Sequence, residues 1–434
     1  MRNLLRQKFF IFLLAIITLS SCSQERIKSR TIELKTSTWG NYKELKILNE
    51  SLMEFEKRYP NIKVSIDHIP QNYIDKVLTE IAGGVGPDVM WIQSNGGFAP
   101  LVRKGLLLDL SPYFAKDKEI GLGDFFPEII DYFTVRGETY CVPTGVGSIA
   151  LVFYNKRLFD EAEVSYPDDD WDWNDLLDKA KKLTLMDKEG KTKQYGFITE
   201  SNRSFPFSNG GRVVDDMENP TKCLEGEKEF KEGLQFLVDL IHKYKVSPSI
   251  SVKERIGMDA RQMFMSGRLA MYNSGLWNVS IFEEMKDFDW DVTIFPRSPH
   301  GGKGFLIDYG GMGVLKTTKY PAEAWELAKW LATDWQRRVT EIGGGQPANK
   351  KMHEQWIKSI FKPKNKDMLI ETVKYGVSAP ILPEWPEIEV TLINPSLYLL
   401  LEGKISVDEY ADRVIPKVNE AFKELKNKYG LLQL

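Results

Sequence analysis

The chain has 434 residues, 42% of them hydrophobic and 27% charged, which is enough to bury a large core divided into about two domains. Its 58 basic and 61 acidic residues give a formal net charge of −3, so it lacks the basic face of a nucleic-acid-binding protein. The four histidines have no metal-ligand spacing, so we expect neither a metal site nor a catalytic histidine; they are His68, His242, His300 and His353.

The N-terminus has the features of an export signal. Arg2, Arg6 and Lys8 precede an apolar run at residues 9–19. This run is shorter than the ~20 residues that a membrane-spanning helix needs, so we interpret it as the core of a signal peptide.

A cysteine follows this apolar run at a characteristic position. The sequence Leu-Ser-Ser-Cys at residues 19–22 resembles a bacterial lipobox, which implies cleavage before Cys22 and diacylation of its sulfur. A plain secretory signal and an uncleaved anchor are the alternatives. We therefore assign residues 1–21 to a lipoprotein signal peptide and residues 22–30 to a polar tether, and expect one lipidated end to hold the protein at a membrane.

The first part of the mature chain alternates between strand and helix patterns. Strands are predicted at residues 31–37, 62–69 and 88–92, and helices at residues 42–59 and 73–82. Strand, helix and strand at short intervals indicate a mostly parallel sheet with helices on its faces.

Ligands of such sheets bind beyond the carboxyl ends of the strands. The residues directly after the three predicted strands can all stack on a ligand or form hydrogen bonds with it, although they would serve equally well to begin helices. They are Trp39, Asn41, Gln71, Asn72, Gln93 and Ser94.

Residues 140–156 are interpreted as a crossover between two lobes. They comprise a short strand, a turn and a second apolar strand. Pro143 lacks a backbone donor, and Gly145 and Gly147 allow unusual dihedral angles, so strand pairing should be interrupted between them. The alternative is an ordinary strand–turn–strand inside one sheet.

The middle of the chain contains an acidic segment at residues 167–175. It lacks the glycine and the distal glutamate of an EF-hand, so we interpret Asp172 and Asp175 as the cap of the following helix. A strong amphipathic helix is predicted at residues 230–244, and a strand running into a Gly-Trp turn at residues 267–277.

Two cysteines remain besides Cys22. Cys141 and Cys223 are compatible with one disulfide in an oxidising compartment and equally with two separate buried thiols.

Several stretches, in order along almost the whole mature chain, resemble the family 1 extracellular solute-binding proteins of ABC importers, the maltodextrin-binding type. Cys141 stands where a glycine is common in that family, and the acidic run Asp168 to Asp170 is unusual. The matching stretches are residues 84–92, 140–159, 171–182, 264–277, 310–315, 322–335 and 403–410.

This resemblance implies an α/β, two-lobe periplasmic-binding-protein type II fold, each lobe a mostly parallel sheet flanked by helices, joined by crossover hinges. The first lobe would comprise residues 31–143 plus 304–347, and the second residues 144–303 plus 348–434. It also implies a monomeric, extracytoplasmic lipoprotein in the periplasm or on the outer face of the cell membrane. Its partners would be a carbohydrate and the permease subunits of an importer, with no nucleic acid and no cofactor.

A sugar presents hydroxyl groups and C–H faces, which proteins meet with planar polar side chains and aromatic rings. Trp277 is the leading stacking candidate because it follows a strand and a glycine, although a core tryptophan is the alternative. Trp385 lies between Pro383 and Pro386, which favours exposure. The ligand-binding residues that we predict from the resemblance are Trp39, Asn41, Asn72, Gln93, Gly145, Asn209, Gly210, Gly275, Trp277, Asp308, Gly310, Glu384 and Trp385.

Two other functions compete with a carbohydrate-binding protein. A secreted glycosidase would need two carboxylates across a cleft, and Asp88, Asp308 and Glu384 show no local pattern that pairs them. A binder of the same fold for a polyol phosphate or a polyamine would need an excess of cations or acids among these residues. We assign no catalytic residue.

Overall fold

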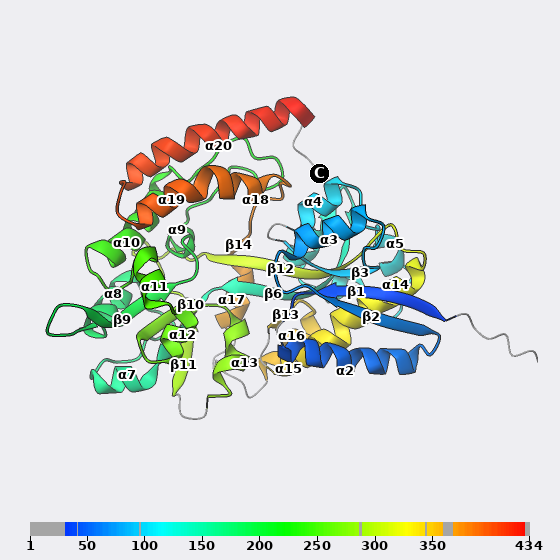
Figure 1. The fold of residues 1–434 in the computed structure, drawn as a ribbon, viewed down its shortest axis with the longest axis horizontal. Coiled ribbons are helices and arrows are strands. Elements are labelled where there is room, and N and C mark those ends of the chain that lie inside the picture. Colours follow the sequence, from blue (N-terminus) through cyan, green and yellow to red (C-terminus); the bar gives the residue numbers. More distant parts are fainter. Residues whose placement is uncertain are drawn as a thin grey trace, which may run out of the picture.

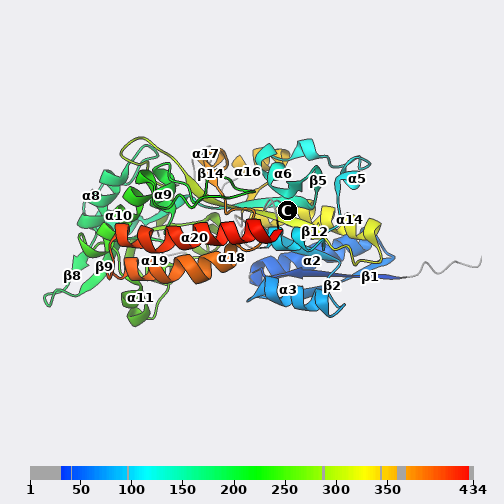
Figure 2. The same ribbon diagram turned by 90° about the horizontal axis from the view of Figure 1, so that it is seen from above.

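The computed structural model contains two α/β lobes that lie side by side, with strands β6 and β12 running between them (Figures 1 and 2). No helix in the described part of the chain is both long enough and apolar enough to cross a membrane. The structure describes residues 31–40, 42–94, 97–285, 289–342, 345–358 and 368–429. The signal peptide, the tether, Cys22 and Asn41 lie outside these ranges.

The sheet of the first lobe has the order β13-β6-β12-β3-β1-β2, and β14 pairs with β12 beside this path. The order β2-β1-β3 is parallel, whereas β12 runs antiparallel to both β3 and β6. The strands are β1 (Ile32–Thr38), β2 (Ile62–His68), β3 (Val89–Gln93), β6 (Cys141–Ile149), β12 (Phe305–Val314), β13 (Gln346–Pro347) and β14 (Gly376–Val377).

Helices cover this sheet, and a small hairpin of β4 (Thr134–Val135) and β5 (Glu138–Thr139) flanks it. In α2 the buried Leu48, Leu52 and Phe55 recur at helical spacing, so this amphipathic pattern buries one face against the sheet. The helices are α2 (Tyr42–Arg58), α3 (Tyr73–Ala82), α4 (Phe98–Arg103), α5 (Ser111–Phe114), η1 (Leu122–Asp124), α6 (Pro127–Phe133), α14 (Pro321–Trp330), the π-helical η3 (Leu331–Trp335), α15 (Gln336–Glu341) and α16 (Lys350–Ile357).

The sheet of the second lobe has the order β11-β7-β10-β9-β8, in which only β9 and β10 are parallel. The predicted α/β fold class is confirmed, but strand directions are more mixed than expected. The strands are β7 (Leu151–Asn155), β8 (Leu185–Met186), β9 (Thr192–Thr199), β10 (Leu269–Ser274) and β11 (Trp290–Ile294).

The helices of the second lobe include α8, whose predicted cap is confirmed because Asp172 accepts hydrogen bonds from the backbone N–H groups of Asn174 and Asp175. The helices are α7 (Lys156–Glu161), α8 (Trp173–Lys182), α9 (Ser204–Ser208), α10 (Lys228–His242), α11 (Ile250–Ile256), α12 (Ala260–Met265), η2 (Leu276–Asn278), α13 (Val279–Phe282) and α17 (Met368–Lys374). The C-terminal helices are α18 (Trp385–Ile388), the π-helical η4 (Glu389–Ile393), α19 (Asn394–Leu401) and α20 (Val407–Tyr429).

The chain changes sheet between β6 and β7, as predicted for residues 140–156. The change comes at Ala150. β6 continues as one strand through Pro143 and Gly145, so the predicted turn is wrong, but strand pairing is interrupted there as predicted, because the register with β12 shifts between Pro143 and Gly145. Pairing is irregular only where Gly310 lies opposite Gly145 and Gly311 lies opposite Pro143. This bulge accommodates a residue that has no N–H to donate. The lobe boundaries stay predictions.

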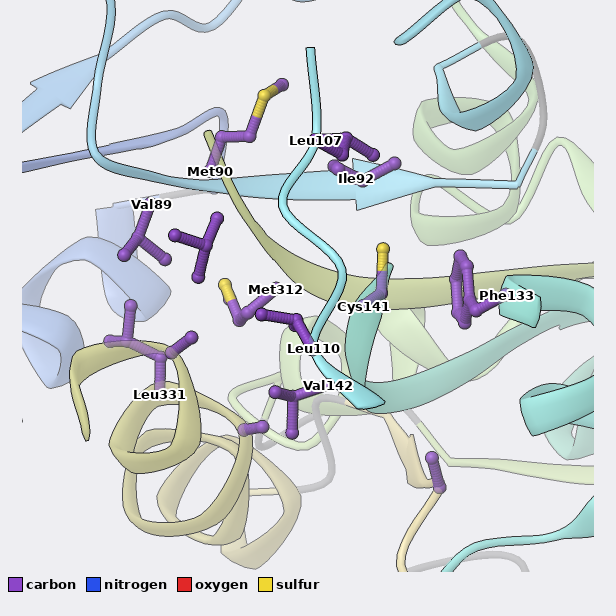
Figure 3. Close-up of a cluster of buried hydrophobic side chains, with 14 of the residues drawn as sticks. Val89, Met90, Ile92, Leu107, Leu110, Phe133, Cys141, Val142, Met312 and Leu331 are labelled. Carbon is purple, nitrogen blue, oxygen red and sulfur yellow. The ribbon is translucent and has the colours of Figure 1, made fainter. Parts of the chain in front are cut away.

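The core of the first lobe lies where β3, β6 and β12 meet (Figure 3). A side chain on Gly311 would come within 2.7 Å of the Cβ of Cys141 and 3.2 Å of the Phe133 ring, so only glycine allows this close packing. Cys141 and Cys223 are both buried and free, so the structure has two separate thiols.

The C-terminal helices α19 and α20 pack over α10 on one side of the second lobe, and α18, nearer to α4, shares their apolar cluster (Figure 1). Beneath them, the Arg203 guanidinium forms ion pairs with Glu225 and Glu389. Glu225 is 1% exposed, and its other oxygen accepts a hydrogen bond from the Tyr410 hydroxyl. These ion pairs and this hydrogen bond therefore hold the helices against the lobe, and apolar side chains surround them.

His353 is a buried histidine at the start of the segment that leaves β13. It is 3% exposed, its Nε2 lies 3.1 Å from the Gln346 Nε2, and burial lowers its pKa from 6.5 to about 4. The unfolded chain protonates His353 more readily than the folded one does. The free energy of unfolding is therefore highest above pH 6.5 and decreases as the pH falls toward 4.

We predict that His353→Gln removes roughly 3 kcal/mol of the stability difference between pH 7 and pH 4. Urea unfolding of both proteins at the two pH values measures this. An unchanged pH dependence in the variant would show that His353 is already solvated.

Candidate ligand-binding site

Tryptophan rings gather at the carboxyl ends of β1 and β3. Trp39 follows β1 and stacks on Trp91 of β3, with ring centroids 4.5 Å apart and 18° between the planes. Tyr73 packs edge-on against Trp39 at 4.7 Å, and Trp335 edge-on against Trp91 at 5.1 Å. Trp39 and Trp91 are half-buried, so the stack forms a rigid apolar plate. Trp91 was not predicted, because it lies within an apolar strand whose outward face the sequence does not identify.

Polar groups lie beside this plate. Gln93 ends β3 and pairs with Gly310 of β12. The Asp308 carboxylate accepts a hydrogen bond of 2.5 Å from the Ser94 hydroxyl, whose oxygen in turn accepts from the backbone N–H of Tyr309 at 2.9 Å. Burial, with the nearby charges of Glu128 and Asp308, raises the pKa of Tyr309 to about 12, so its hydroxyl stays protonated.

Trp277 approaches the same strands from the second lobe. It lies in the turn after β10, and a Cβ on Gly147 of β6 would be 3.8 Å from its ring and 3.9 Å from the Asp308 Cβ. A Cβ on Gly275 would come within 2.0 Å of the ring, so this glycine lets the indole fold back. The structure thus brings together a second-lobe aromatic ring and a carboxylate on the crossover strands.

Buried polar atoms without a protein partner mark the same region. Among the described residues they include the indole Nε1 of Trp91 and the hydroxyl of Thr144, each 2.9 Å from a Cβ built on Gly310. Ser148 of β6 and Asn278 beside Trp277 also have such atoms. Each buried donor or acceptor without a partner lowers the stability of the protein by about 1–3 kcal/mol, unless a molecule outside the chain forms a hydrogen bond with it. A hydroxyl-bearing solute is a suitable partner.

Three further predicted residues have other surroundings. Asn72 directly precedes Tyr73 and is exposed in a left-handed conformation (φ 50°) before α3. Asn209 is 7% exposed, and its amide donates to the Glu229 carbonyl and the Glu232 carboxylate of α10. Gly210 is exposed next to it, with φ +85°.

The prediction that Trp385 is exposed is wrong. The side chain is 1% exposed in the apolar cluster under α20, with the Arg203 guanidinium 5.8 Å from its ring. Pro386 lies at the first turn of α18 rather than in a rigid loop, so the segment turns inward. Glu384 is occupied by an ion pair of 2.6 Å with Arg103 of α4.

Asp88 and Asp308, two of the carboxylates named for a glycosidase, are not arranged as a pair. Asp88 accepts hydrogen bonds from the Lys35 N–H and the Thr318 hydroxyl at the start of β3. Asp308 lies beyond the other end of this five-residue strand, which spans about 16 Å. Glycosidase carboxylates lie within roughly 10 Å of each other, so these two cannot flank one glycosidic bond in this conformation.

An ion pair joins the two lobes near the tryptophans. The Lys43 ammonium of α2 donates to the Ser280 carbonyl at 3.0 Å and pairs with Glu284 at 2.5 Å. Lys43 follows Trp39 closely in the sequence, and Ser280 follows Trp277. The contact therefore links the two chain segments that carry the half-buried tryptophans.

Comparison with solved structures identifies the class of fold. An ABC substrate-binding protein of Listeria monocytogenes, in complex with cycloalternan, superimposes with a TM-score of 0.80 at 26% identity, covering 91% of this chain and 99% of that one. A solute-binding protein of Thermotoga lettingae bound with α-D-tagatose gives 0.76 at 23% identity, covering 90% and 100%. The molecule is a two-lobe binding protein of the type found in ABC import systems.

Sequence comparison then gives the family. Residues 39–337 match the family of bacterial extracellular solute-binding proteins. A putative binding protein of Brucella abortus is 23% identical over 402 residues, covering 89% of this chain and 92% of the relative. The chain belongs to the bacterial extracellular solute-binding protein family.

Proposed function

We propose that this protein is the substrate-binding lipoprotein of an ABC importer, which captures a mono- or oligosaccharide between its lobes and delivers it to the membrane permease. The observation that carries the proposal is that β6 and β12 contact aromatic rings of both lobes: Trp277 of the second lobe lies beside Gly147 and Asp308, and Trp91 of the Trp39–Trp91 stack lies beside Gly310. Indole faces match the C–H faces of a sugar, and the carboxylate and amide groups match its hydroxyls.

The sugar-bound relatives support a carbohydrate over other solutes. The Listeria protein was solved with cycloalternan and the Thermotoga protein with α-D-tagatose. The group formed by Trp39, Trp91, Gln93, Asp308 and Trp277 contains neither the cations that a polyol phosphate needs nor the several acids that a polyamine needs.

A thermal-shift screen against mono- and oligosaccharides tests the function. A sugar present at a hundredfold its Kd stabilises the native state by about 2.7 kcal/mol, which appears as a raised Tm. Chromatography of the recovered sugar separates a binder, which returns it unchanged, from an enzyme. Stabilisation by a polyol phosphate or a polyamine, with none by any sugar, would overturn the carbohydrate assignment.

The anchor has its own test. We expect the full chain expressed in a bacterium to fractionate with membranes and to incorporate a labelled fatty acid, and Cys22→Ala to lose the label. A wild-type protein found unlabelled in the soluble extracytoplasmic fraction would contradict the lipid anchor and leave the binding function standing.

We predict that the Lys43 contact stabilises the arrangement in which both lobes hold the ligand. Lys43→Ala should raise the Kd for the bound sugar about two- to fivefold, because an exposed ion pair contributes roughly 0.2–1 kcal/mol. The difference should shrink at high salt, which screens exposed charges.

Titration calorimetry at low and high salt measures this effect, and Lys46→Ala, on the exposed side of the same helix, is the control. Equal changes in Kd for both variants would mean that Lys43 acts only through the general charge of α2.

A further inference from the structure

A cavity of about 590 Å³ opens in the second lobe, at the carboxyl end of β9. Its walls come from Ile198 of β9, from Glu200 just after this strand, from α10, from α11, from the start of α12 and from Leu401 of α19. None of the described residues that line it is aromatic or belongs to β6 or β12, so it is separate from the tryptophan site. Its volume lies within the ~300–1,000 Å³ usual for small-molecule sites.

Lys253 of α11 is an unpartnered cation in this wall. Its side chain is half-buried, and within the described ranges its ammonium makes neither a hydrogen bond nor an ion pair. Burial lowers the pKa of Lys253, while the charges of Glu200 and Glu402 oppose that shift. A half-buried ammonium retains three donors and is stabilised by an acceptor that reaches it.

Two carboxylates near Lys253 are fixed by other partners. Glu200 accepts hydrogen bonds from the hydroxyls of Tyr272 and Ser274. Glu402 accepts from the backbone N–H and the hydroxyl of Ser251, at 2.9 and 2.7 Å. Each carboxylate oxygen has a further lone pair. Lys253 and Glu200 therefore both line the cavity without forming an ion pair with each other, and the Glu402 charge acts on Lys253 from outside its wall.

This arrangement selects among ligand classes. An anion would satisfy Lys253 but would also meet the carboxylates of Glu200, Glu254 and Asp259 in the cavity wall. A cation would be repelled by Lys253. A neutral polyol avoids both penalties, because each hydroxyl accepts from an ammonium and donates to a carboxylate. The aliphatic side chains of Ile198, Leu401 and their neighbours then contact its C–H groups.

We propose that this cavity is a second ligand site, which binds a neutral polyhydroxyl molecule of monosaccharide size through Lys253 as donor and Glu200 as acceptor. The proposal does not depend on the site between the lobes, and the two can be tested separately. Binding beside Trp39 and Trp277 changes tryptophan fluorescence, whereas binding in a cavity without aromatic rings releases heat with little change in emission.

Titration calorimetry of the full chain with D-glucose and with myo-inositol tests the proposal. We expect saturable binding of at least one probe that persists in Trp277→Ala and weakens roughly tenfold or more in Lys253→Met, which keeps the apolar stem but loses the donors. Lys188→Met, at an exposed lysine outside the cavity, should bind like the wild type. Glu200→Gln should also weaken binding, and it serves as the second variant if Lys253→Met does not fold.

Three results would overturn the proposal. The first is that neither probe binds saturably to the wild type. The second is that binding is lost in Trp277→Ala and unchanged in both Lys253→Met and Glu200→Gln, which would place the sugar between the lobes. The third is that propionate or putrescine binds in a Lys253-dependent manner while both polyols fail, which would assign the cavity to a charged ligand.

Discussion

Replacing Arg203 by methionine is expected to lower the free energy of unfolding by about 3–5 kcal/mol. The guanidinium lies between Glu225 and Glu389 under the C-terminal helices, and the Glu225 side chain is 1% exposed. Removing the cation leaves a buried carboxylate whose side-chain partner among the described residues is the Tyr410 hydroxyl alone. The large cost comes from this uncompensated charge rather than from the value of the pair itself.

Urea unfolding of the wild type and the variant measures the loss. Lys231→Met is the matched control, since it also breaks an ion pair between the body of the second lobe and α20. The Lys231–Asp408 pair is 2.9 Å long but exposed, with 80% of the Asp408 side chain accessible, so its removal should cost no more than about 1 kcal/mol. Similar small losses in both variants would mean that water reaches Glu225.

The local elements were predictable because their signals are local. The strands and helices from β1 to β3 follow from alternation and from 3.6-residue periodicity, and Pro60 lies just beyond α2. The cap of α8 depends on Asp172 and Asp175, only three residues apart, and it formed as expected.

The partners of strands were harder to predict. Residues 140–156 were interpreted as two strands in two sheets, but the sequence does not show that β6 pairs with β12 and β13, which lie far along the chain. The antiparallel direction of these strands depends on that pairing. Pro143 indicated a break, yet the bulge opposite Gly310 and Gly311 absorbs the missing donor.

The site was predictable only in part for the same reason. Trp39 and Gln93 lie at one sheet edge because the carboxyl ends of the parallel strands β1 and β3 meet there. Asp308, from within β12, lies just beyond Gln93 because Gln93 pairs with Gly310. The burial of Trp385 depends on Arg203 and on α20, which its neighbours in sequence do not encode. The assignment of Trp39, Gln93 and Asp308 as ligand-binding residues stays a proposal.

Replacing Trp277 by alanine is expected to weaken sugar binding by about 2–4 kcal/mol, which is roughly thirtyfold to a thousandfold in Kd. The indole is half-buried against Gly147, close to Asp308, and it belongs to the second lobe while Trp39 belongs to the first. A ring that contacts the sugar opposite the Trp39–Trp91 plate contributes only when both lobes hold the ligand. Its loss should therefore affect affinity far more than stability.

Calorimetry with the sugar identified by the thermal-shift screen measures Kd, and unfolding midpoints measure stability. Trp330→Ala is the control, because Trp330 is a similarly half-buried tryptophan that donates to Ser51, on the helical side of the first lobe. Equal affinities in the two variants would contradict a role for Trp277 in binding.

Gly275→Ala tests the position of the ring rather than its presence. The added methyl group would lie 2.0 Å from the indole, so the ring must swing away from Gly147 while the chain keeps every tryptophan. If the position of the ring determines sugar affinity, Gly275→Ala should weaken binding nearly as much as Trp277→Ala does. Normal binding by Gly275→Ala, with weak binding by Trp277→Ala, would instead mean that the ring is recruited by the ligand from another orientation.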